Sequence, residues 1–178
     1  MARHLALLGS INVGGNRLKM GDLREALSDA WLAEVETVVA SGNVLFAADG
    51  RSVPECEADI ATLLDSHLSL DVMVTVRTRD EVAAAIDGNP FHGDGEDRFV
   101  HTHFLEHETS QARFEQLVAD HEGRGPERLA LGDRMLFIDY VAGTGTSKLT
   151  AAFIERRLET RGTARNMRSL KRILEKME

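Results

Sequence analysis

Short apolar runs alternate with helically spaced apolar residues along the first half of the chain. The runs have the length of β-strands and lie at residues 3–9, 35–40, 44–48 and 72–76. Between them, apolar side chains recur every three or four positions over residues 20–30 and again up to residue 67, which predicts two helices. Ser52 and Glu55 have the spacing of a capping box at the start of the second helix. The order strand-helix-strand, strand-helix-strand is the split βαβ of a ferredoxin-like plait.

The second half repeats this order of elements. Expected strands lie at residues 98–105, 127–131, 134–140 and 162–164, and expected helices at 110–121, from Lys148 to about 159, and 166–177. A short helix over residues 80–86 and a turn-forming, acidic stretch over 87–96 separate the halves. We predict an α+β protein of two tandem ferredoxin-like (α-β plait, βαββαβ) units, residues 1–88 and 96–178, with an extra C-terminal helix.

Composition narrows the class of protein. The chain of 178 residues is 43% hydrophobic, which fits a folded globular protein of one domain or two small ones. Its single Cys56 cannot form an internal disulfide, which indicates a reducing cytoplasm, and neighbouring glutamates raise the pKa of this thiol and make it unreactive. No segment approaches the ~20 apolar residues of a membrane span. We expect a soluble, cytoplasmic protein with no membrane partner.

Charge is unevenly distributed along the chain. The net charge is −8, yet the stretch from Lys148 to the C-terminus is basic, so the preceding part is strongly acidic. A basic tail can contact phosphates or nucleic acid. More often, such a tail is a solvated helix face that docks against the acidic half of its own chain. Both interpretations stay open at the level of sequence.

A glycine- and asparagine-rich turn follows the first expected strand. Its residues Asn12, Gly14 and Gly15, with Lys19 just beyond, precede a helix N-terminus, where backbone N–H groups and the helix dipole favour an anion. The same residue types also make an ordinary tight turn. In a plait, the hairpin after the second strand emerges at the same end of the sheet, so Ser41 and Asn43 should be neighbours of this turn.

A second polar cluster is expected in the other half. The loop of residues 143–148, with Ser147 and Lys148, should lie near Arg165 and Asn166, where the fourth strand ends. It lacks the spacing and Gly-Lys pair of a Walker motif. Arg165 offers a rigid fork for carboxylate or phosphate, and Asn166 can cap the last helix while facing the same space. Alternatively, Arg165 pairs with an acid, and Ser147 or Thr146 merely caps the next helix.

Two histidines of the second half are candidate metal ligands. His101 and His103 share one face of an expected strand, because side chains alternate. Two imidazoles can share a zinc ion, but no third ligand is evidently placed, and exposed histidines are the simpler interpretation. We predict no metal and no cofactor.

Five short motifs occur in a characteristic order, INVGG at 11–15, SGN at 41–43, NPF at 89–91, SKLT at 147–150 and T-x-RN at 163–166. In this combination the chain resembles the bacterial "domain of unknown function 1697" (DUF1697) family over nearly its whole length. The resemblance implies paired ferredoxin-like units and no established activity. The family's characteristic residues are here Asn12, Gly14, Gly15, Ser41, Gly42, Asn43, Ser147, Lys148, Thr163, Arg165 and Asn166. Gly9-Ser10 replaces the family's Arg-Gly, which removes a cation from the first turn, and Met167 replaces an aromatic residue.

The leading functional hypothesis is a small anionic or nucleotide-type ligand held at these polar loops, with the reaction and any catalytic residues unknown. The expected contacts are Asn12, Gly14, Gly15, Lys19, Ser41, Asn43, Ser147, Lys148, Arg165 and Asn166. The alternatives are a nucleic-acid-binding module, or a structural protein that forms homodimers without a ligand. The chain lacks the aromatic pairs with which plaits stack bases, and its acidic body opposes phosphate polymers.

Overall fold

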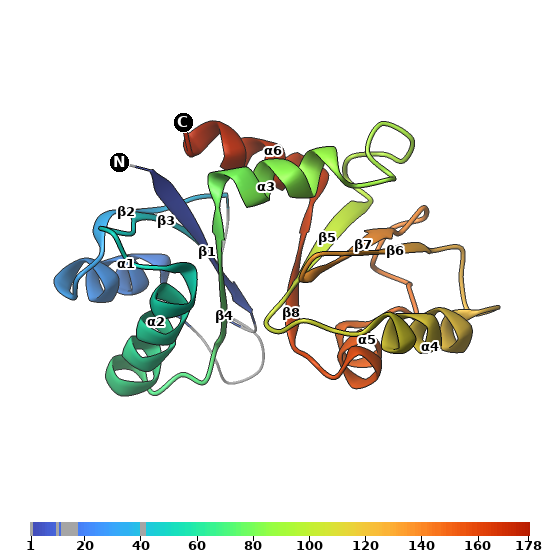
Figure 1. Cartoon of the computed structure of the whole chain (residues 1–178), viewed down its shortest axis with the longest axis horizontal. Coiled ribbons are helices and arrows are strands. Elements are labelled where there is room, and N and C mark those ends of the chain that lie inside the picture. The colour runs from blue at the N-terminus through green and yellow to red at the C-terminus, as the bar shows by residue number, and fades with distance from the viewer. Residues whose placement is uncertain (1, 10, 12–17, 40–41) are drawn as a thin grey trace. The chain divides into compact units, whose positions relative to one another are not determined.

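The computed structural model describes residues 2–9, 11, 18–39 and 42–178 (Figure 1). The first sheet contains the strands β1 (Arg3–Gly9), β2 (Ala33–Thr37), β3 (Asn43–Ala47) and β4 (Met73–Thr78), and the second contains β5 (Val100–Leu105), β6 (Arg128–Gly132), β7 (Met135–Asp139) and β8 (Gly162–Asn166). The helices are α1 (Met20–Asp29), α2 (Val53–Leu68), α3 (Arg79–Asp87), α4 (Gln111–His121), α5 (Ala151–Leu158) and α6 (Met167–Lys176).

Both sheets are antiparallel and have the same strand order. The first runs β2-β3-β1-β4 and the second runs β6-β7-β5-β8. This order, with the element sequence βαββαβ, confirms two ferredoxin-like units. Each set of βαββαβ elements is followed by one further helix, α3 or α6, and both helices agree with those predicted at residues 80–86 and 166–177.

The core of the first unit is formed by the apolar strand β1 and the apolar faces of two helices. Ala6 and Leu8 of β1 point to the sheet face that α1 and α2 cover in Figure 1. Leu27 of α1 and Ile60 of α2 meet them there, and all four are at most 2% exposed. Each fully buried leucine or isoleucine contributes about 1.5–3 kcal/mol relative to an exposed one. Two amphipathic helices and a continuous apolar strand therefore specify this layer together.

Helix starts are fixed by local hydrogen bonds. The capping box is confirmed, since the Ser52 backbone N–H donates to Glu55 Oε2 at 2.8 Å and the Ser52 hydroxyl donates to the same oxygen at 2.6 Å. At α5, however, Thr150 Oγ1 accepts from the N–H of Phe153 at 3.2 Å. Capping of this helix by Ser147 or Thr146 is therefore wrong, because the helix begins later than their positions allow.

The chain divides into two compact units, Met1–Ala83 with Arg172–Glu178, and Ala84–Lys171. Residues 172–178 group with the first unit, whereas the sequence analysis placed them in the second unit, residues 96–178. Arg3 explains this difference, because its guanidinium donates to the carbonyl oxygen of Lys176 at 2.9 Å and to Glu36 at 3.0 Å. These contacts hold the end of α6 beside the first strand.

The expected linker at residues 87–96 is a set of packed turns. The Asn89 side chain accepts from the N–H of Phe91 at 3.0 Å, and the N–H of Gly95 donates to the carbonyl of Phe91 at 2.9 Å. Asn89 and Phe91 are buried. The turn-forming residues were recognised correctly, but the segment belongs to the fold of the second unit.

Candidate functional site

The end of β1 lies beside the β2–β3 turn, as the plait topology predicted. Leu7 pairs with Asn43, and the N–H of Leu8 donates to the carbonyl of Gly42 at 2.8 Å. Four of the predicted ligand contacts, Asn12, Gly14, Gly15 and Ser41, lie outside the described residues. The described neighbours of this end of the sheet are therefore Gly42, Asn43 and the start of α1.

Asn43 holds the hairpin turn. Its side chain is only 1% exposed, and its amide nitrogen donates to the carbonyl of Val39 at 2.8 Å. Val39 has a positive φ of 47°, which a β-branched residue rarely adopts. Gly42 has a φ of 86°, which suits glycine. The family motif SGN thus contributes an amide that stabilises a strained turn.

The N-terminus of α1 is the positive end of the helix dipole, and the Lys19 side chain does not cap it. Lys19 occupies the N-cap position in extended conformation, and its side chain makes no capping hydrogen bond. The N–H groups of the first helical turn and the exposed ammonium of Lys19 therefore both favour an anion. Asp22, in the same turn, is an opposing charge.

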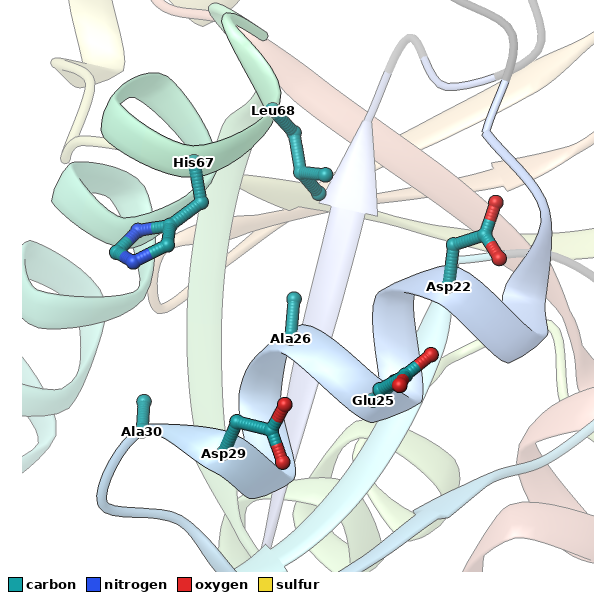
Figure 2. A pocket seen from close by; sticks show the side chains of 7 residues that line it. All are labelled: Asp22, Glu25, Ala26, Asp29, Ala30, His67 and Leu68. Carbon is teal, nitrogen blue, oxygen red and sulfur yellow. The ribbon is translucent and has the colours of Figure 1, made fainter.

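The outer face of α1 is acidic. A pocket of about 430 Å³ is lined by Asp22, Glu25, Ala26, Asp29, Ala30, His67 and Leu68. Figure 2 shows the three carboxylates spaced along α1, with His67 and Leu68 supplied by α2. This face repels phosphate groups, which opposes nucleic-acid binding there.

Arg165 is held against its own strand. Its guanidinium nitrogen Nη1 donates to Thr163 Oγ1 at 2.7 Å and to the carbonyl of Ala164 at 2.9 Å. Burial lowers the pKa of Arg165 to about 10, because a desolvated cation is disfavoured. The charged form of this side chain would be stabilised by a nearby anion.

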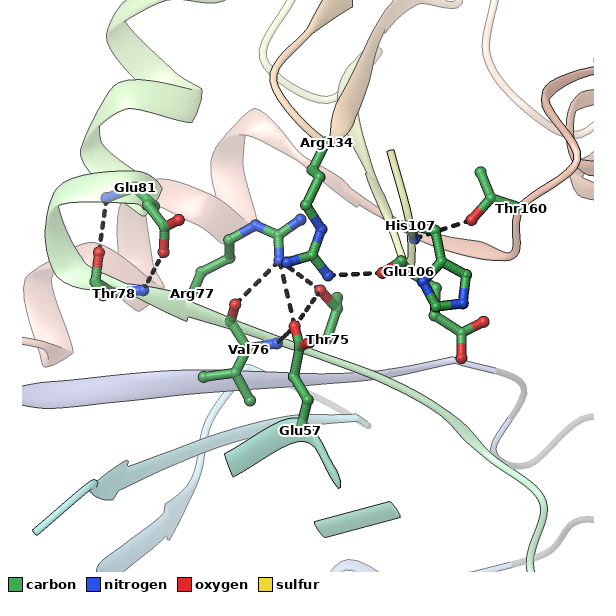
Figure 3. A network of polar contacts seen from close by, with 10 residues as sticks. All are labelled: Glu57, Thr75, Val76, Arg77, Thr78, Glu81, Glu106, His107, Arg134 and Thr160. Carbon is green, nitrogen blue, oxygen red and sulfur yellow. Dashed lines mark hydrogen bonds and ion pairs between the residues drawn. The ribbon is translucent and has the colours of Figure 1, made fainter. Parts of the chain in front are cut away.

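The same arrangement recurs in the first unit, at a position that the sequence analysis did not predict. Arg77 Nη1 donates to the carbonyl of Val76 at 3.0 Å and to Thr75 Oγ1, as Figure 3 shows. Glu57 accepts from the N–H of Val76 at 2.8 Å and lies 3.8 Å from Arg77. The signal was present in the sequence, since Thr-x-Arg stands at residues 75–77 and again at 163–165.

Asn166 caps the last helix, as predicted. Its side-chain oxygen accepts from the N–H of Ser169 at 2.9 Å. The expectation that Asn166 and Arg165 face the same space does not hold, because consecutive strand residues point to opposite faces. Asn166 pairs with His101 across the sheet, and Arg165 pairs with Thr102.

In the first unit, the start of α3 is capped by Thr78, which follows Arg77 as Asn166 follows Arg165. The Glu81 N–H donates to Thr78 Oγ1 at 3.2 Å, and the Thr78 N–H donates to Glu81 Oε2 at 2.8 Å (Figure 3). The residue that follows each Thr-x-Arg motif therefore caps a helix: Thr78 caps α3 and Asn166 caps α6. This explains the Asn of the family motif as a structural residue.

Ser147 contacts a buried carboxylate and Lys148 is exposed. The Ser147 hydroxyl donates to Glu127 Oε1, and Glu127 Oε2 lies 3.0 Å from His121 Nε2. Burial alone would raise the pKa of Glu127, but hydrogen bonds from Ser147 and His121 bring it below its usual value. Sequence reasoning missed this cluster, because Glu127 stands twenty residues before Ser147 in a glycine-rich turn.

The two strand histidines are not exposed. His101 stacks edge-on against Tyr140 with ring centroids 4.9 Å apart, and His103 is only 3% exposed. The prediction of exposed histidines is therefore wrong. Over the described ranges, no three His, Cys, Asp or Glu side chains are grouped to hold a metal ion.

Several bases of the basic tail form ion pairs with acids of the chain. Lys171 Nζ lies 2.7 Å from Asp97, Arg157 Nε lies 2.8 Å from Asp120, and Arg161 Nε lies 2.8 Å from Glu106. These pairs favour docking of the tail on its own acidic partners over a free phosphate-binding surface. In the part of the chain that the structure describes, no helix is long and apolar enough to cross a membrane.

Comparison with known proteins agrees with this architecture. A family model described as "Protein of unknown function (DUF1697)" matches residues 1–137. The solved structure of the conserved bacterial protein SP0830 from Streptococcus pneumoniae is similar, with 22% identity, a TM-score of 0.74, and coverage of 99% of this chain and 98% of that chain. At this identity the likeness shows the fold alone. No curated protein matches the chain significantly.

Proposed function

The chain belongs to the DUF1697 family of proteins of unknown function, and we propose that it binds a small anionic or nucleotide-type ligand through its polar loops. The observation that carries the proposal is the start of α1. There, the exposed Lys19 occupies the N-cap position and its side chain does not cap the first turn of the helix. The preceding residues Asn12, Gly14 and Gly15, and Ser41 of the hairpin, are proposed to complete the contacts.

The chemistry of this end suits a phosphate or carboxylate. Backbone N–H groups at a helix start donate to anion oxygens, and Lys19 adds an ammonium donor. Asp22 weakens the attraction, which favours a compact ligand held close to the N–H groups over a long polyanion. The proposal concerns binding, and the reaction, if there is one, is left open.

Arg165 is proposed as an anion anchor in the second unit. Its charged form is disfavoured by burial, so an anion nearby would restore stability that desolvation removes. The proposal gives Lys148, which is exposed, the role of a peripheral cation. The side chains of Ser147, Asn43 and Asn166 make hydrogen bonds within the fold, and the proposal gives them the role of shaping the loops around the ligand.

Thermal unfolding with inorganic phosphate, AMP and acetate tests the proposal. Bound anion stabilises the folded state by mass action, so phosphate and AMP should raise the Tm by several degrees at concentrations well above Kd. Lys19→Ala should abolish the shift. The matched control is Arg24→Ala, which removes an exposed cation from the same helix and should keep the shift.

If both variants lost the Tm shift equally, the shift would be caused by overall positive charge and not by a site at Lys19. This result would overturn the proposal. Arg165→Ala separates a second site from architecture. A folded variant with a smaller shift supports the anchor role, and unfolding of the variant assigns Arg165 to the fold. A salt-sensitive gel shift with RNA, or a ligand-independent dimer in light scattering with no anion response, would favour the alternative functions.

A further inference from the structure

Strand β6 is the least protected edge of the two sheets. The edge strands are β2 and β4 in the first sheet and β6 and β8 in the second. An edge strand presents backbone N–H and C=O groups that can pair with another chain, and folded proteins protect such edges with bulges, charged side chains or contacts that engage the free groups. Among the described residues, such a device is found at β2, β4 and β8 and not at β6.

The last strand of each unit has its edge covered by side chains. In β4, the carbonyl of Val76 accepts from Arg77 Nη1 at 3.0 Å, and its N–H donates to Glu57 at 2.8 Å (Figure 3). In β8, the carbonyl of Ala164 accepts from Arg165 Nη1 at 2.9 Å. Backbone groups engaged in this way are not available to a further strand.

The edge of β2 is distorted, whereas that of β6 is regular. The pairing of β2 changes register between Ala33 and Glu36, and Glu34 between them has a φ of 54°. This bulge disrupts the edge on which a further strand would have to pair. In contrast, β6 pairs with β7 along its whole length without a shift and contains no proline.

The backbone groups of Leu129 and Leu131 point away from the sheet. The two-residue loop between β6 and β7 closes on Gly132 and Met135, and a loop of this length requires a hydrogen-bonded pair there. Bonded pairs alternate along an antiparallel ladder, so Ala130 also bonds to β7, whereas Leu129 and Leu131 do not. In the part of the chain that the structure describes, no other residue bonds the N–H or C=O of either leucine.

An exposed apolar side chain lies beside this edge. Val118 of α4 is 42% exposed, which only Val141 exceeds among the large hydrophobic side chains of the described residues. Val118 and Leu129 line one pocket of about 220 Å³, together with His121 and the turn that follows it. Leu131 shares the sheet face of Leu129, because side chains alternate, and both are half-buried. Apolar surface next to free backbone groups favours a protein strand over water.

We propose that β6 pairs with β6 of a second copy of this chain, antiparallel and related by a two-fold axis at Ala130. Leu129 of each copy then lies opposite Leu131 of the other, and each such pair exchanges both backbone hydrogen bonds. The second sheets of the two copies join into one continuous sheet, with leucines of both copies next to Val118. The pairing uses none of the proposed anion contacts, so a Tm response to phosphate neither requires nor excludes it.

The charges of β6 complement each other when the strand is reversed. Arg128 is the only charged residue of the strand, and the exposed Asp133 follows its other end. In the proposed register, Arg128 lies opposite Gly132 of the other copy and next to its Asp133, so opposite charges meet on both sides of the axis. Arg128 also pairs with Asp139 of its own copy, and its side chain remains 43% exposed. A shift of two residues places Arg128 opposite Arg134 of the other copy or moves it away from Asp133.

Hydrogen exchange of the unchanged, full-length protein at rising concentration tests the pairing. As light scattering shows the mass doubling, the amides of Leu129 and Leu131 should lose their fast exchange, because they become donors in the new ladder. The amides of Ala130 and Gly132 bond to β7 in either state and serve as the internal control. A monomer at every concentration, or a dimer in which the two leucine amides still exchange fast, would overturn the proposal.

Variants of the edge test it independently. Leu131→Pro removes an outward N–H without removing a bond to β7, and an edge strand tolerates proline at such a position. This variant should remain monomeric at concentrations at which the unchanged protein is a dimer. Leu131→Ala also loses the leucine side chain but keeps the N–H, so it should still dimerise. Circular dichroism shows whether each variant is folded.

Asp133→Lys keeps the test decisive if Leu131→Pro does not fold. It changes an exposed side chain in the loop after β6 and places a like charge next to Arg128 of the other copy. Dimerisation should weaken at low salt and recover partly at high salt, because salt screens the repulsion. A dimer of unchanged affinity in a folded Leu131→Pro, or in Asp133→Lys at low salt, would contradict pairing through β6.

Discussion

At the scale of single residues, burial shapes the charge states of the second unit. Desolvation is the main cause that lowers the pKa of His103 to about 4, and the positive charge of Arg165 and the neighbouring His101 add to it. The pKa of His101 is lowered as well, mainly by burial. Both imidazoles are therefore neutral at neutral pH, and protonation opposes the folded state.

His103 should make stability sensitive to acid. Its folded pKa of about 4 lies below the ordinary value of 6.5, so the unfolded state binds the proton first. The free energy of unfolding should fall as the pH decreases from 6.5 towards 4, by roughly 3 kcal/mol at most. Urea unfolding across this range measures the slope, and His103→Phe should flatten it.

His107→Gln is the control, because His107 is exposed and its substitution should leave the slope unchanged. A slope that stays the same in His103→Phe would assign the acid sensitivity to other groups.

At the scale of elements, caps and turns decide where helices and strands begin. Ser52, Ser110 and Thr150 each precede a helix and contact its first turn, so these starts are local properties of the sequence. Strand β2 differs, since it covers Ala33–Thr37 instead of residues 35–40. Its register shifts between Ala33 and Glu36, and Glu34 has a φ of 54°. Such a bulge breaks the simple alternation on which the prediction relied.

Asn166 offers a test of a capping residue in a family motif. Asn166→Ala should lower the free energy of unfolding by about 1 kcal/mol, because the N–H of Ser169 loses its acceptor. Asn166→Asp keeps an acceptor and should retain most of the stability. Chemical unfolding gives both values. If Asn166→Ala is as stable as the unchanged protein but loses the Tm shift with phosphate, Asn166 is a ligand contact instead of a cap.

At the scale of the whole molecule, the two units repeat element by element. Each contains four strands and two helices in the same order, then a third helix, and each has Thr-x-Arg at the end of its fourth strand. Matching backbone contacts support the correspondence, since Leu8 donates to Gly42 at 2.8 Å and Leu105 donates to Arg134 at 3.0 Å. The two units therefore share their topology and a few residues at matching positions.

The last residues of the chain stabilise the first unit. Removal of residues 172–178 eliminates the Lys176 carbonyl that accepts from Arg3 and the Glu178 carboxylate 3.5 Å from Arg79. It also removes the buried side chain of Met177. Hydrogen exchange should show reduced protection in β1 and β2, with β6 and β7 less affected. Equal loss of protection in all four strands would show that the two units unfold as one.

The sequence by itself determined the fold class, the order of strands and helices, and most helix starts, because alternation, helical spacing and caps act between near neighbours. It also placed the end of β1 beside the β2–β3 turn, since the plait connectivity dictates that neighbourhood. The residue types of the family motifs were equally visible.

Only the tertiary structure decided what those motif residues do. Asn43 donates to a carbonyl within a turn, Ser147 donates to Glu127 twenty positions earlier, and Arg165 donates to Thr163 of its own strand. The pocket at His121 was also invisible in sequence. The physical reason is that burial and hydrogen bonds between distant residues arise when elements pack, and no local pattern records which polar side chains will be enclosed together.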